Sequence, residues 1–180
     1  MTLALRGRRL SSRRRGELLP YLLLIPAGIV ILGLTAWSAV VKLGSVKPGQ
    51  TVLTQGTGGV SLFALQFAKM CGARVMATAG SADKCKACLD LGADRAIDYK
   101  TEDFVAAAKE ATGGKGVDVI LDMVGGEYTE RNVIAAAEDG RIVQIATLGG
   151  ADVKLNLARL MIKRLTLTGS TLRPRTREVK

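Results

Sequence analysis

Six short apolar segments, separated by stretches with helical patterning, constrain this chain more than any other feature. They follow one another after Gly49 at residues 51–55, 73–78, 95–99, 117–124, 141–146 and 165–170. Helices are predicted between them over about 59–70, 81–92, 102–112, 127–138 and 155–164. Short strands that are apolar on both faces and separated by helices are typical of a parallel sheet covered on both sides. The alternation therefore predicts an α/β fold with a doubly wound, parallel, six-stranded sheet of the Rossmann type.

A glycine-rich turn joins the first predicted strand to the first predicted helix, in the stretch TVLTQGTGGVS at residues 51–61. Gly56 to Ser61 have the form G-x-G-x-x-S, in which the first Gly permits a tight turn and the second lets the backbone approach a pyrophosphate. The last position needs a small residue for close packing of helix on strand, and Ser61 is small. The helix amino terminus would then offer N–H groups and a partial positive charge to phosphates. We interpret this turn as a nucleotide-binding loop rather than as a purely structural turn.

The end of the second predicted strand bears on which nucleotide binds. Sites that prefer NAD usually carry Asp or Glu there, about 20 residues after the glycine turn, to bind the ribose hydroxyls. Residues 77–81 read ATAGS with no acid, and Lys84 follows. A hydroxyl and a cation suit a 2′-phosphate, so the pattern favours NADP(H) over NAD(H). The alternative is that Ser81 only caps the following helix and that Lys84 is solvated.

Charge and cysteine content argue against several classes of function. The formal net charge of +10 is spread as +5 over residues 1–17, +6 over 159–180 and −1 over 42–158. A nearly neutral body does not favour a specific nucleic-acid-binding face. The chain has three cysteines, two of them in a C-x-x-C pair at 85–88, and no histidine, so we expect no metal. The odd, clustered cysteines favour reduced thiols and a cytoplasmic protein over a disulfide framework.

The amino-terminal region differs from the rest of the chain. A basic tail at residues 1–17, with six Arg, precedes the uncharged run LLPYLLLIPAGIVILGLTAWSAVV at residues 18–41. A run of this length could cross a bilayer, for which about 20 apolar residues are needed, with the arginines on the cytoplasmic side. The competing interpretation is a buried helix that packs on the domain, which Pro20 and Pro26 would interrupt. We therefore expect an additional apolar helix at 18–41 that could hold the protein at the inner face of a membrane.

Two family resemblances divide the chain. Residues 1–33, through RRRGELLPYLLLIPAGIVIL, resemble the start of a sugar ABC transporter permease subunit, and a join near Gly33 is an open alternative. From Leu34 to Lys180 the chain resembles the cofactor-binding domain of the medium-chain dehydrogenases/reductases. The stretches GVDVILDMVGG, GRIVQIATLGG and KRLTLTGSTLR are similar to the quinone oxidoreductase branch in particular.

This second resemblance implies a role for each matched position. The turn at 56–60 would hold the pyrophosphate, and residues 81, 84 and 99 would surround the adenosine 2′-phosphate. Residues after the fourth and fifth strands would line the adenosine and nicotinamide path. The cofactor-binding residues that it implies are Gly56, Thr57, Gly58, Gly59, Val60, Ser81, Lys84, Tyr99, Val124, Gly125, Ile145, Ala146 and Thr147.

The resemblance also implies an activity, namely zinc-independent transfer of hydride from NADPH to a quinone or an activated alkene. The turn GTGGVS is instead similar to alcohol-dehydrogenase-like relatives. Because the family carries a GroES-like catalytic domain before this domain and a returning segment after it, we expect a chain truncated at both ends. Residues 42–172 would form the NAD(P)-binding domain and 173–180 a truncated tail. A non-catalytic nucleotide-binding module, or an alcohol-dehydrogenase-like relative that could be membrane-anchored, is the alternative.

Catalytic residues and partners are less well defined by the sequence. Asp122 and Tyr128 are the candidate acid–base residues, but a strand end and a helix start favour structural roles for both, so no catalytic residue is assigned. The family resemblance implies a small-molecule hydride acceptor. It also implies a homodimer formed through the last predicted strand, 165–170, because an exposed edge strand favours pairing.

Overall fold

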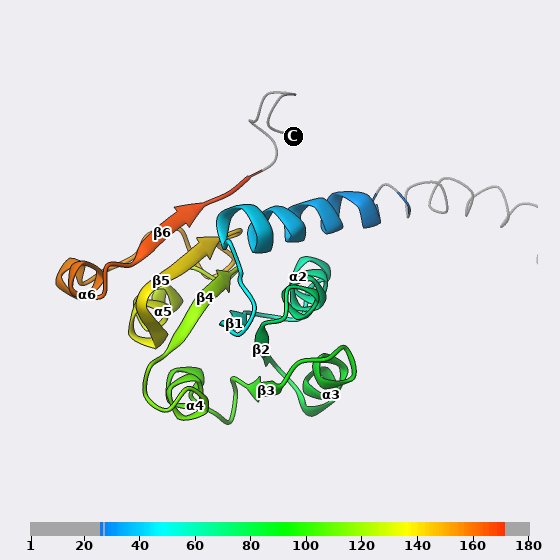
Figure 1. Cartoon of the computed structure of the whole chain (residues 1–180), viewed down its shortest axis with the longest axis horizontal. Coiled ribbons are helices and arrows are strands. Elements are labelled where there is room, and N and C mark those ends of the chain that lie inside the picture. Colours follow the sequence, from blue (N-terminus) through cyan, green and yellow to red (C-terminus); the bar gives the residue numbers. More distant parts are fainter. Residues whose placement is uncertain (1–25, 27, 172–180) are drawn as a thin grey trace, which may run out of the picture.

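A computed structural model describes residues 26 and 28–171 of the chain. The predicted fold is confirmed: six parallel strands form one sheet in the order β3-β2-β1-β4-β5-β6 (Figure 1). The order reverses between β1 and β4, and ligands of doubly wound sheets bind in the crevice at such a switch point. The strands are β1 Thr51–Thr54, β2 Arg74–Ala79, β3 Arg95–Asp98, β4 Val117–Asp122, β5 Ala136–Gln144 and β6 Thr166–Gly169.

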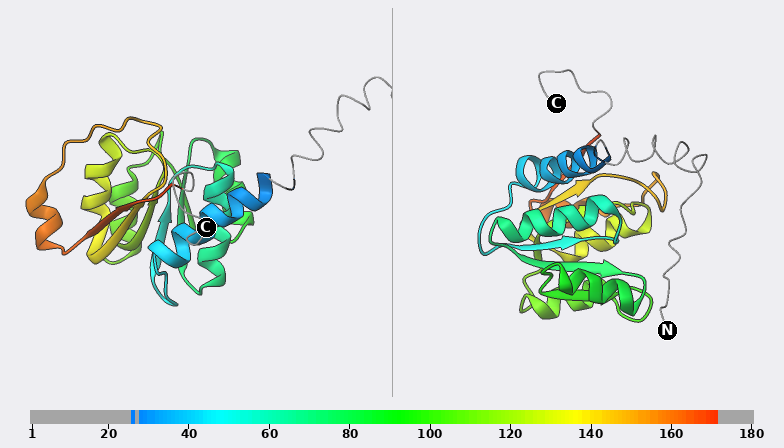
Figure 2. Two further views of the ribbon diagram at one scale, coloured as in Figure 1. Left: turned by 90° about the horizontal axis from the view of Figure 1, so that it is seen from above. Right: turned by 90° about the vertical axis from the view of Figure 1, so that its right-hand side faces the viewer.

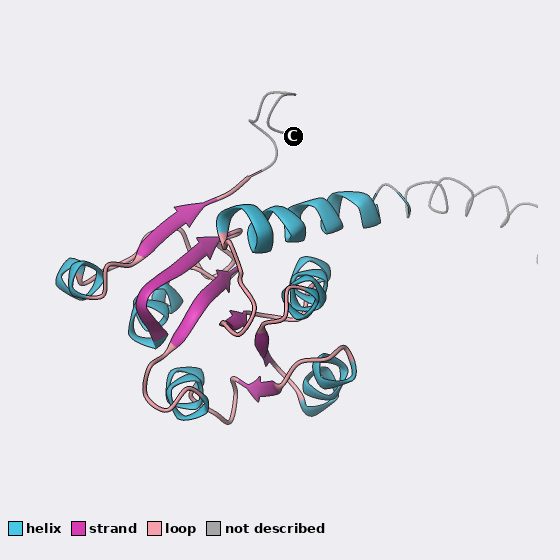
Figure 3. Cartoon of the chain, viewed as in Figure 1, coloured by secondary structure: helices cyan, strands magenta, loops and turns pink. Residues whose placement is uncertain are grey.

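Helices cover both faces of this sheet (Figure 3). Val52 of β1 packs in one apolar cluster with α2 (Gly59–Met70) and α3 (Ala82–Asp90). The next residue, Leu53, packs on the opposite face with α4 (Phe104–Ala111) and α5 (Glu127–Ala135). Successive strand residues point to opposite faces, so each strand needs apolar residues at nearly every position.

A helix at residues 28–37 continues into a π-helical turn, η1 (Ser38–Leu43), and lies on the same face as α2 (Figures 1 and 2). One side of it is buried against the sheet through Ala36, Ala39 and Val40. The other side exposes large apolar residues, namely Ile29, Val30, Ile31, Leu34, Trp37 and Val41. Among the described residues, no helix has both the length and the hydropathy needed to cross a bilayer.

Parts of several predictions lie outside the described residues. These parts are the basic tail at 1–17, most of the apolar run before residue 28, and the predicted tail at 173–180. The expected apolar helix therefore has structural support only over its described portion, and the proposed membrane contact stays a prediction.

The prediction for the end of α5 was wrong. Residues 136–138 were assigned to the helix, but α5 ends at Ala135 and β5 begins at Ala136, which pairs with Val117 of β4. Lys163 explains the early end, because its ammonium donates to the carbonyl oxygens of Val133, Ile134 and Ala136 at 2.6–3.0 Å. A distant lysine thus satisfies the last carbonyls of the helix and overrides the helical propensity of the alanines.

The remaining described boundaries agree with the predictions to within two residues. The strand predicted at 141–146 ends at Gln144, which leaves Ile145 to Thr147 in a loop. The last helix, α6, spans Leu157–Ile162 rather than 155–164, and none of its residues is buried. Helix ends fray and their hydrogen bonds depend on the surroundings, so differences of this size are expected.

Candidate dinucleotide-binding site

The glycine turn lies where β1 meets α2. Gly56 has a φ of 78°, a conformation that favours glycine, and its N–H donates to Oγ1 of Thr78 in β2 at 3.1 Å. Ser61 is buried, and its hydroxyl donates to the carbonyl oxygen of Gln55 at 3.0 Å. The small side chain predicted at position 61 therefore ties α2 closely to the end of β1.

The amino terminus of α2 is suited to an anion. Its N-cap residue is Gly58, and within the described chain no side chain caps the helix and no acidic residue lies in its first turn. An added Cβ at Gly58 would have no described atom within 4 Å, so backbone here faces open space. Helix-terminal N–H groups need a partner, and phosphate oxygens are well matched to them.

Asp122, the last residue of β4, organises the neighbouring loop. Its Oδ1 accepts from the backbone N–H groups of Val124 at 2.6 Å and Gly125 at 3.0 Å. Its Oδ2 accepts from the side-chain amide of Asn132 at 2.8 Å. Burial raises the pKa of Asp122 above its ordinary value, and these hydrogen bonds oppose the rise because they stabilise the carboxylate. These hydrogen bonds join Asp122 to the loop and to α5, and its structural role stays a prediction.

The loops after β4 and β5 are hydrogen-bonded to each other. The N–H of Gly126 donates to the carbonyl of Gly150 at 3.0 Å, and that of Gly149 donates to the carbonyl of Val124 at 2.6 Å. Gly125 and Gly126 both have positive φ, and an added Cβ would lie 2.7 and 2.6 Å from the carbonyl oxygens of Gly150 and Gly149. Only glycine fits at these two positions.

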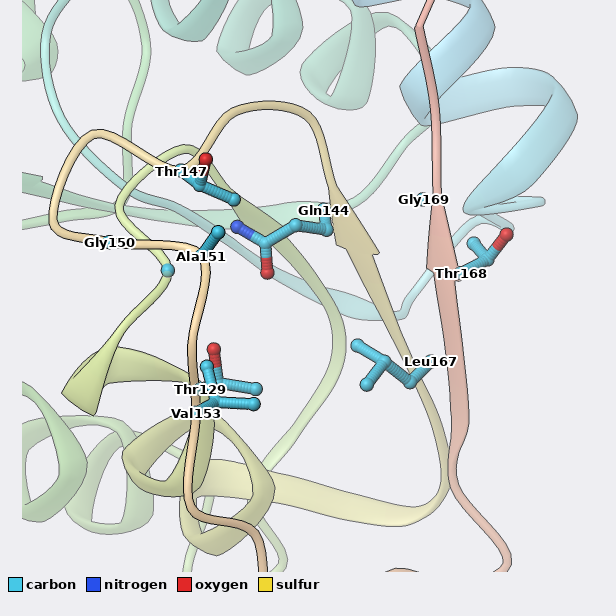
Figure 4. A pocket seen from close by; sticks show the side chains of 10 residues that line it. Thr129, Gln144, Thr147, Gly150, Ala151, Val153, Leu167, Thr168 and Gly169 are labelled. Atoms are coloured by element: carbon cyan, nitrogen blue, oxygen red, sulfur yellow. The ribbon is translucent and has the colours of Figure 1, made fainter.

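A pocket opens between these loops and the β6 edge. Figure 4 shows Gln144, Thr147 and Ala151 on one side of it and Leu167 of β6 on the other. Gln144 is held in place because its Nε2 donates to the carbonyl oxygen of Ala146 at 2.6 Å. The described residues that line the pocket are uncharged: Gly125, Thr129, Gln144, Thr147, Gly150, Ala151, Val153, Leu167, Thr168 and Gly169.

The ends of β2 and β3 bring the predicted 2′-phosphate residues together. Ser81 caps α3 as predicted, accepting from the N–H of Lys84 at 3.4 Å. The Tyr99 hydroxyl lies 2.5 Å from the place that a Cβ on Gly80 would occupy, so Gly80 leaves room for the ring. The Lys84 and Tyr99 side chains are both exposed.

Most of the predicted cofactor residues therefore gather at the carboxyl ends of β1 to β5, with Lys84 in the first turn of α3. Sequence reasoning missed the polar residues beneath them: Gln55, Thr78, Asn132 and Gln144. The available signal was a polar residue at a position that the strand or helix pattern assigns to the core, as with Asn132 in α5.

Comparison with known proteins agrees with this geometry. A family model described as zinc-binding dehydrogenase matches residues 59–180. The chain belongs to this family. The resemblance to the medium-chain dehydrogenases/reductases is confirmed, and the chain carries the nucleotide-binding domain of these proteins.

Three relatives show how far the similarity extends. Quinone oxidoreductase 1 of Escherichia coli (strain K12) is 37% identical over 135 residues, which are 74% of this chain and 41% of that protein. The crystal structure of E. coli quinone oxidoreductase complexed with NADPH has a TM-score of 0.72 at 37% identity, covering 78% of this chain and 44% of that chain. The nucleotide-binding subdomain of the enoylreductase domain of PpsC from Mycobacterium tuberculosis has a TM-score of 0.73 at 36% identity, covering 80% and 81%. The chain thus spans less than half the length of the quinone oxidoreductases that it matches.

The family description mentions zinc, and the described residues do not fit that metal. Within residues 26 and 28–171, no three His, Cys, Asp or Glu side chains gather in a group that could hold a metal ion. The cysteines are free thiols, with Cys71 and Cys85 partly exposed and Cys88 buried. Burial is the main cause that raises the pKa of Cys85 and of Cys88.

Proposed function

We propose that this chain is the NADP(H)-binding domain of an oxidoreductase of the quinone oxidoreductase type. In this proposal NADPH gives a hydride to a quinone or an activated alkene. The observation that carries it is the uncapped amino terminus of α2 at the sheet's switch point, beside the loop that Asp122 holds. Helix-terminal N–H groups bind the pyrophosphate there, and the strand-end loops hold the two nucleosides.

The choice of NADP(H) rests on the end of β2. No acid follows that strand, and Ser81, Lys84 and Tyr99 stand where ribose hydroxyls or a 2′-phosphate would be bound. The Ser81 oxygen accepts from the Lys84 N–H, so its own hydrogen is available to a phosphate oxygen. Exposed Lys84 supplies a positive charge that NADH would not use.

The chain's own residues contribute binding and orientation to this reaction. The nicotinamide would enter the uncharged pocket beside Thr147 and Gly125. Once bound, NADPH itself supplies the hydride. No described side chain is assigned to proton transfer, because Asp122 is engaged by the loop and Tyr128 stacks on Phe104 with ring centroids 5.2 Å apart.

A second candidate is a purely nucleotide-binding role for the domain. It is favoured by the PpsC subdomain, which this chain matches over 81% of the length of that structure. A nucleotide-binding module would bind NADPH without turnover, whereas an oxidoreductase would consume NADPH with an acceptor. We place the protein in the cytoplasm, as its free thiols suggest.

The deciding experiment is a titration with NADPH and NADH of three proteins: the unaltered chain, Lys84→Ala and Lys86→Ala. Lys86 is the matched control, an exposed lysine on the same helix that pairs with Asp90. We expect NADPH to bind more tightly than NADH, and Lys84→Ala to weaken NADPH by about 10-fold, since hydrogen bonds to charged groups contribute about 1.5–3 kcal/mol. Lys86→Ala should change neither affinity. Absence of binding by either nucleotide would refute the proposal.

Turnover then separates the two candidates. NADPH consumption would be followed with a quinone and, separately, with an α,β-unsaturated carbonyl compound. Consumption with either acceptor above the protein-free rate supports the oxidoreductase. Tight NADPH binding with background consumption favours the binding module.

We also propose that the chain pairs with a second copy through β6. This strand forms one edge of the sheet, and Leu167 on it is exposed, as are Leu157, Met161 and Ile162 of α6. An open strand edge with apolar neighbours favours pairing with another strand.

A further inference from the structure

Three polar side chains meet in the interior beneath the dinucleotide site: Gln55 after β1, Asp122 at the end of β4 and Asn132 in α5. All three are fully buried. The side-chain amide of Gln55 donates to Oδ1 of Asn132, and the amide of Asn132 donates to Oδ2 of Asp122 at 2.8 Å. The three side chains therefore form one chain of hydrogen bonds with Asn132 at its centre.

Each end of this chain is attached to a loop of the site. Gln55 directly precedes Gly56, the first residue of the glycine turn. Asp122 accepts from the N–H groups of Val124 and Gly125 in the loop after β4. The carbonyl oxygen of Asp122 also accepts from the amide of Gln144 at 3.4 Å, next to the loop after β5. One buried network thus joins the base of the turn predicted to bind the pyrophosphate to the bases of the loops predicted to line the adenosine and nicotinamide path.

The chemistry of Asn132 makes its amide hard to replace. Its oxygen accepts from one neighbour while its nitrogen donates to the other, and an apolar side chain can do neither. Loss of Asn132 would leave a buried amide and a buried carboxylate without their partner, which is costlier than losing an exposed hydrogen bond. The loops would then have to move to recover hydrogen bonds.

We infer that Asn132 is a positioning residue of the dinucleotide site, which fixes the glycine turn and the loop after β4 relative to each other. It is fully buried and acts through Gln55 and Asp122. This inference rests on the proposed function for its binding readout, but its structural content can be tested without cofactor. A side chain that merely filled the core would affect stability without coupling the two loops.

The first test compares Asn132→Leu with Val133→Ala. Val133 is the matched control, since it is the next residue of α5 and is fully buried in an apolar cluster. Urea unfolding would show how much stability each variant loses. We expect Asn132→Leu to weaken NADPH binding by 10-fold or more, and Val133→Ala to change it by less than 2-fold at a comparable loss of stability. Equal affinities in the two variants would overturn the inference.

The second test exchanges the two groups. Asn132→Asp alone places two carboxylates face to face and should abolish tight binding. In the double variant Asp122→Asn/Asn132→Asp, the new amide at 122 can donate to the new carboxylate at 132 and still accept from the loop N–H groups. Gln55 can still donate to position 132. We expect the double variant to recover affinity to within a few-fold of the unaltered chain, whereas affinity as weak as in Asn132→Asp would contradict the inference.

The third test needs no cofactor. Amide hydrogen exchange of the unliganded chain would be followed by mass spectrometry at residues 55–58 and 123–126. Asn132→Leu should raise exchange in both segments together, and Gln55→Met, a milder change, should raise it chiefly at 55–58. Exchange that stays unchanged in both segments would refute the inference even if NADPH did not bind. If only the proposed function failed, Asn132→Leu would still raise exchange in both segments, but the unaltered chain would not bind NADPH.

Discussion

The centre of the sheet and its β6 edge are built on opposite principles. At the centre, β1 and β4 are buried on both faces, and Asn132 joins Gln55, which follows β1, to Asp122, the last residue of β4. At the edge, three of the four residues of β6 are exposed and α6 buries none of its residues. The centre thus satisfies its groups internally, while the edge presents apolar side chains and the side of β6 that pairs with no described strand.

This difference suggests that the two regions have different roles, ligand positioning at the centre and contact with another surface at the edge. A rigid, fully hydrogen-bonded centre can hold a ligand geometry within narrow limits. An edge with unburied Leu157, Met161 and Ile162 is suited to contact with another surface. Mutations at the two regions should therefore have effects of different kinds as well as different sizes.

The largest effect should follow from Phe104→Ala at the centre. Phe104 is fully buried in the cluster beneath β4, where it stacks on Tyr128. Removal of a buried Phe side chain costs about 3–5 kcal/mol of unfolding free energy. Met161→Ala in α6 is the control from the edge and should stay within about 0.5 kcal/mol. Urea unfolding of both variants would check the comparison, and similar losses would disprove it.

An intermediate effect should follow from Leu167→Lys on β6. A charged residue on an edge strand opposes pairing with a second strand, so we expect the dimer dissociation constant to rise by about 10-fold or more. Sedimentation velocity over a range of concentrations would measure it. Met70→Lys, at an exposed apolar position in α2, is the control and should leave the dimer unchanged. A monomeric unaltered chain would disprove the dimer itself.

The smallest effect should come from the ion pair between Arg131 and Asp103, next to buried Phe104. Arg131 donates to Asp103 at 2.7 Å, and this hydrogen bond is the main cause that lowers the pKa of Asp103. An acid whose pKa is lower in the folded state than in the unfolded state stabilises the fold at pH values above its unfolded-state pKa, which is about 3.9 for Asp. This contribution is lost as the pH falls through the folded-state pKa.

Asp103→Asn keeps an oxygen that can cap α4 but removes the charge. We expect it to lower the unfolding free energy by about 0.2–1 kcal/mol at pH 7, because both partners are partly exposed. The difference from the unaltered chain should disappear at about pH 2, in chemical unfolding at both pH values. A difference that persists in acid would mean that the pair contributes through packing.

The sheet, the glycine turn and the Ser81 cap could be predicted because each depends on residues close together in sequence. Apolar alternation marks the strands, and a serine three residues before Lys84 marks the helix start. The start of β5 could not be predicted in this way. It depends on Lys163, which donates to Ala136 from 27 positions further along the chain.

The buried network under the site was missed for the same reason. Gln55 and Asn132 are 77 positions apart, so no pattern of neighbouring residues in the sequence indicates that they are hydrogen-bonded. A structural role was predicted for Asp122 from its place at a strand end, but its contacts with Val124, Gly125 and Asn132 depend on the folded topology. Local patterns thus locate the loops of the site, and tertiary contacts determine how they are held.

The glycines of the site do not all carry the same evolutionary information. Gly125 and Gly126 would clash with the carbonyls of Gly150 and Gly149 if they bore a Cβ, so selection for folding alone would preserve them in a lineage that no longer used a cofactor. Gly58 has an ordinary φ of −74° and no described neighbour within 4 Å of a Cβ placed there. Drift would be free to replace it unless a ligand approached the backbone. In any set of descendants, position 58 therefore records whether the nucleotide was retained, whereas 125 and 126 record only the fold.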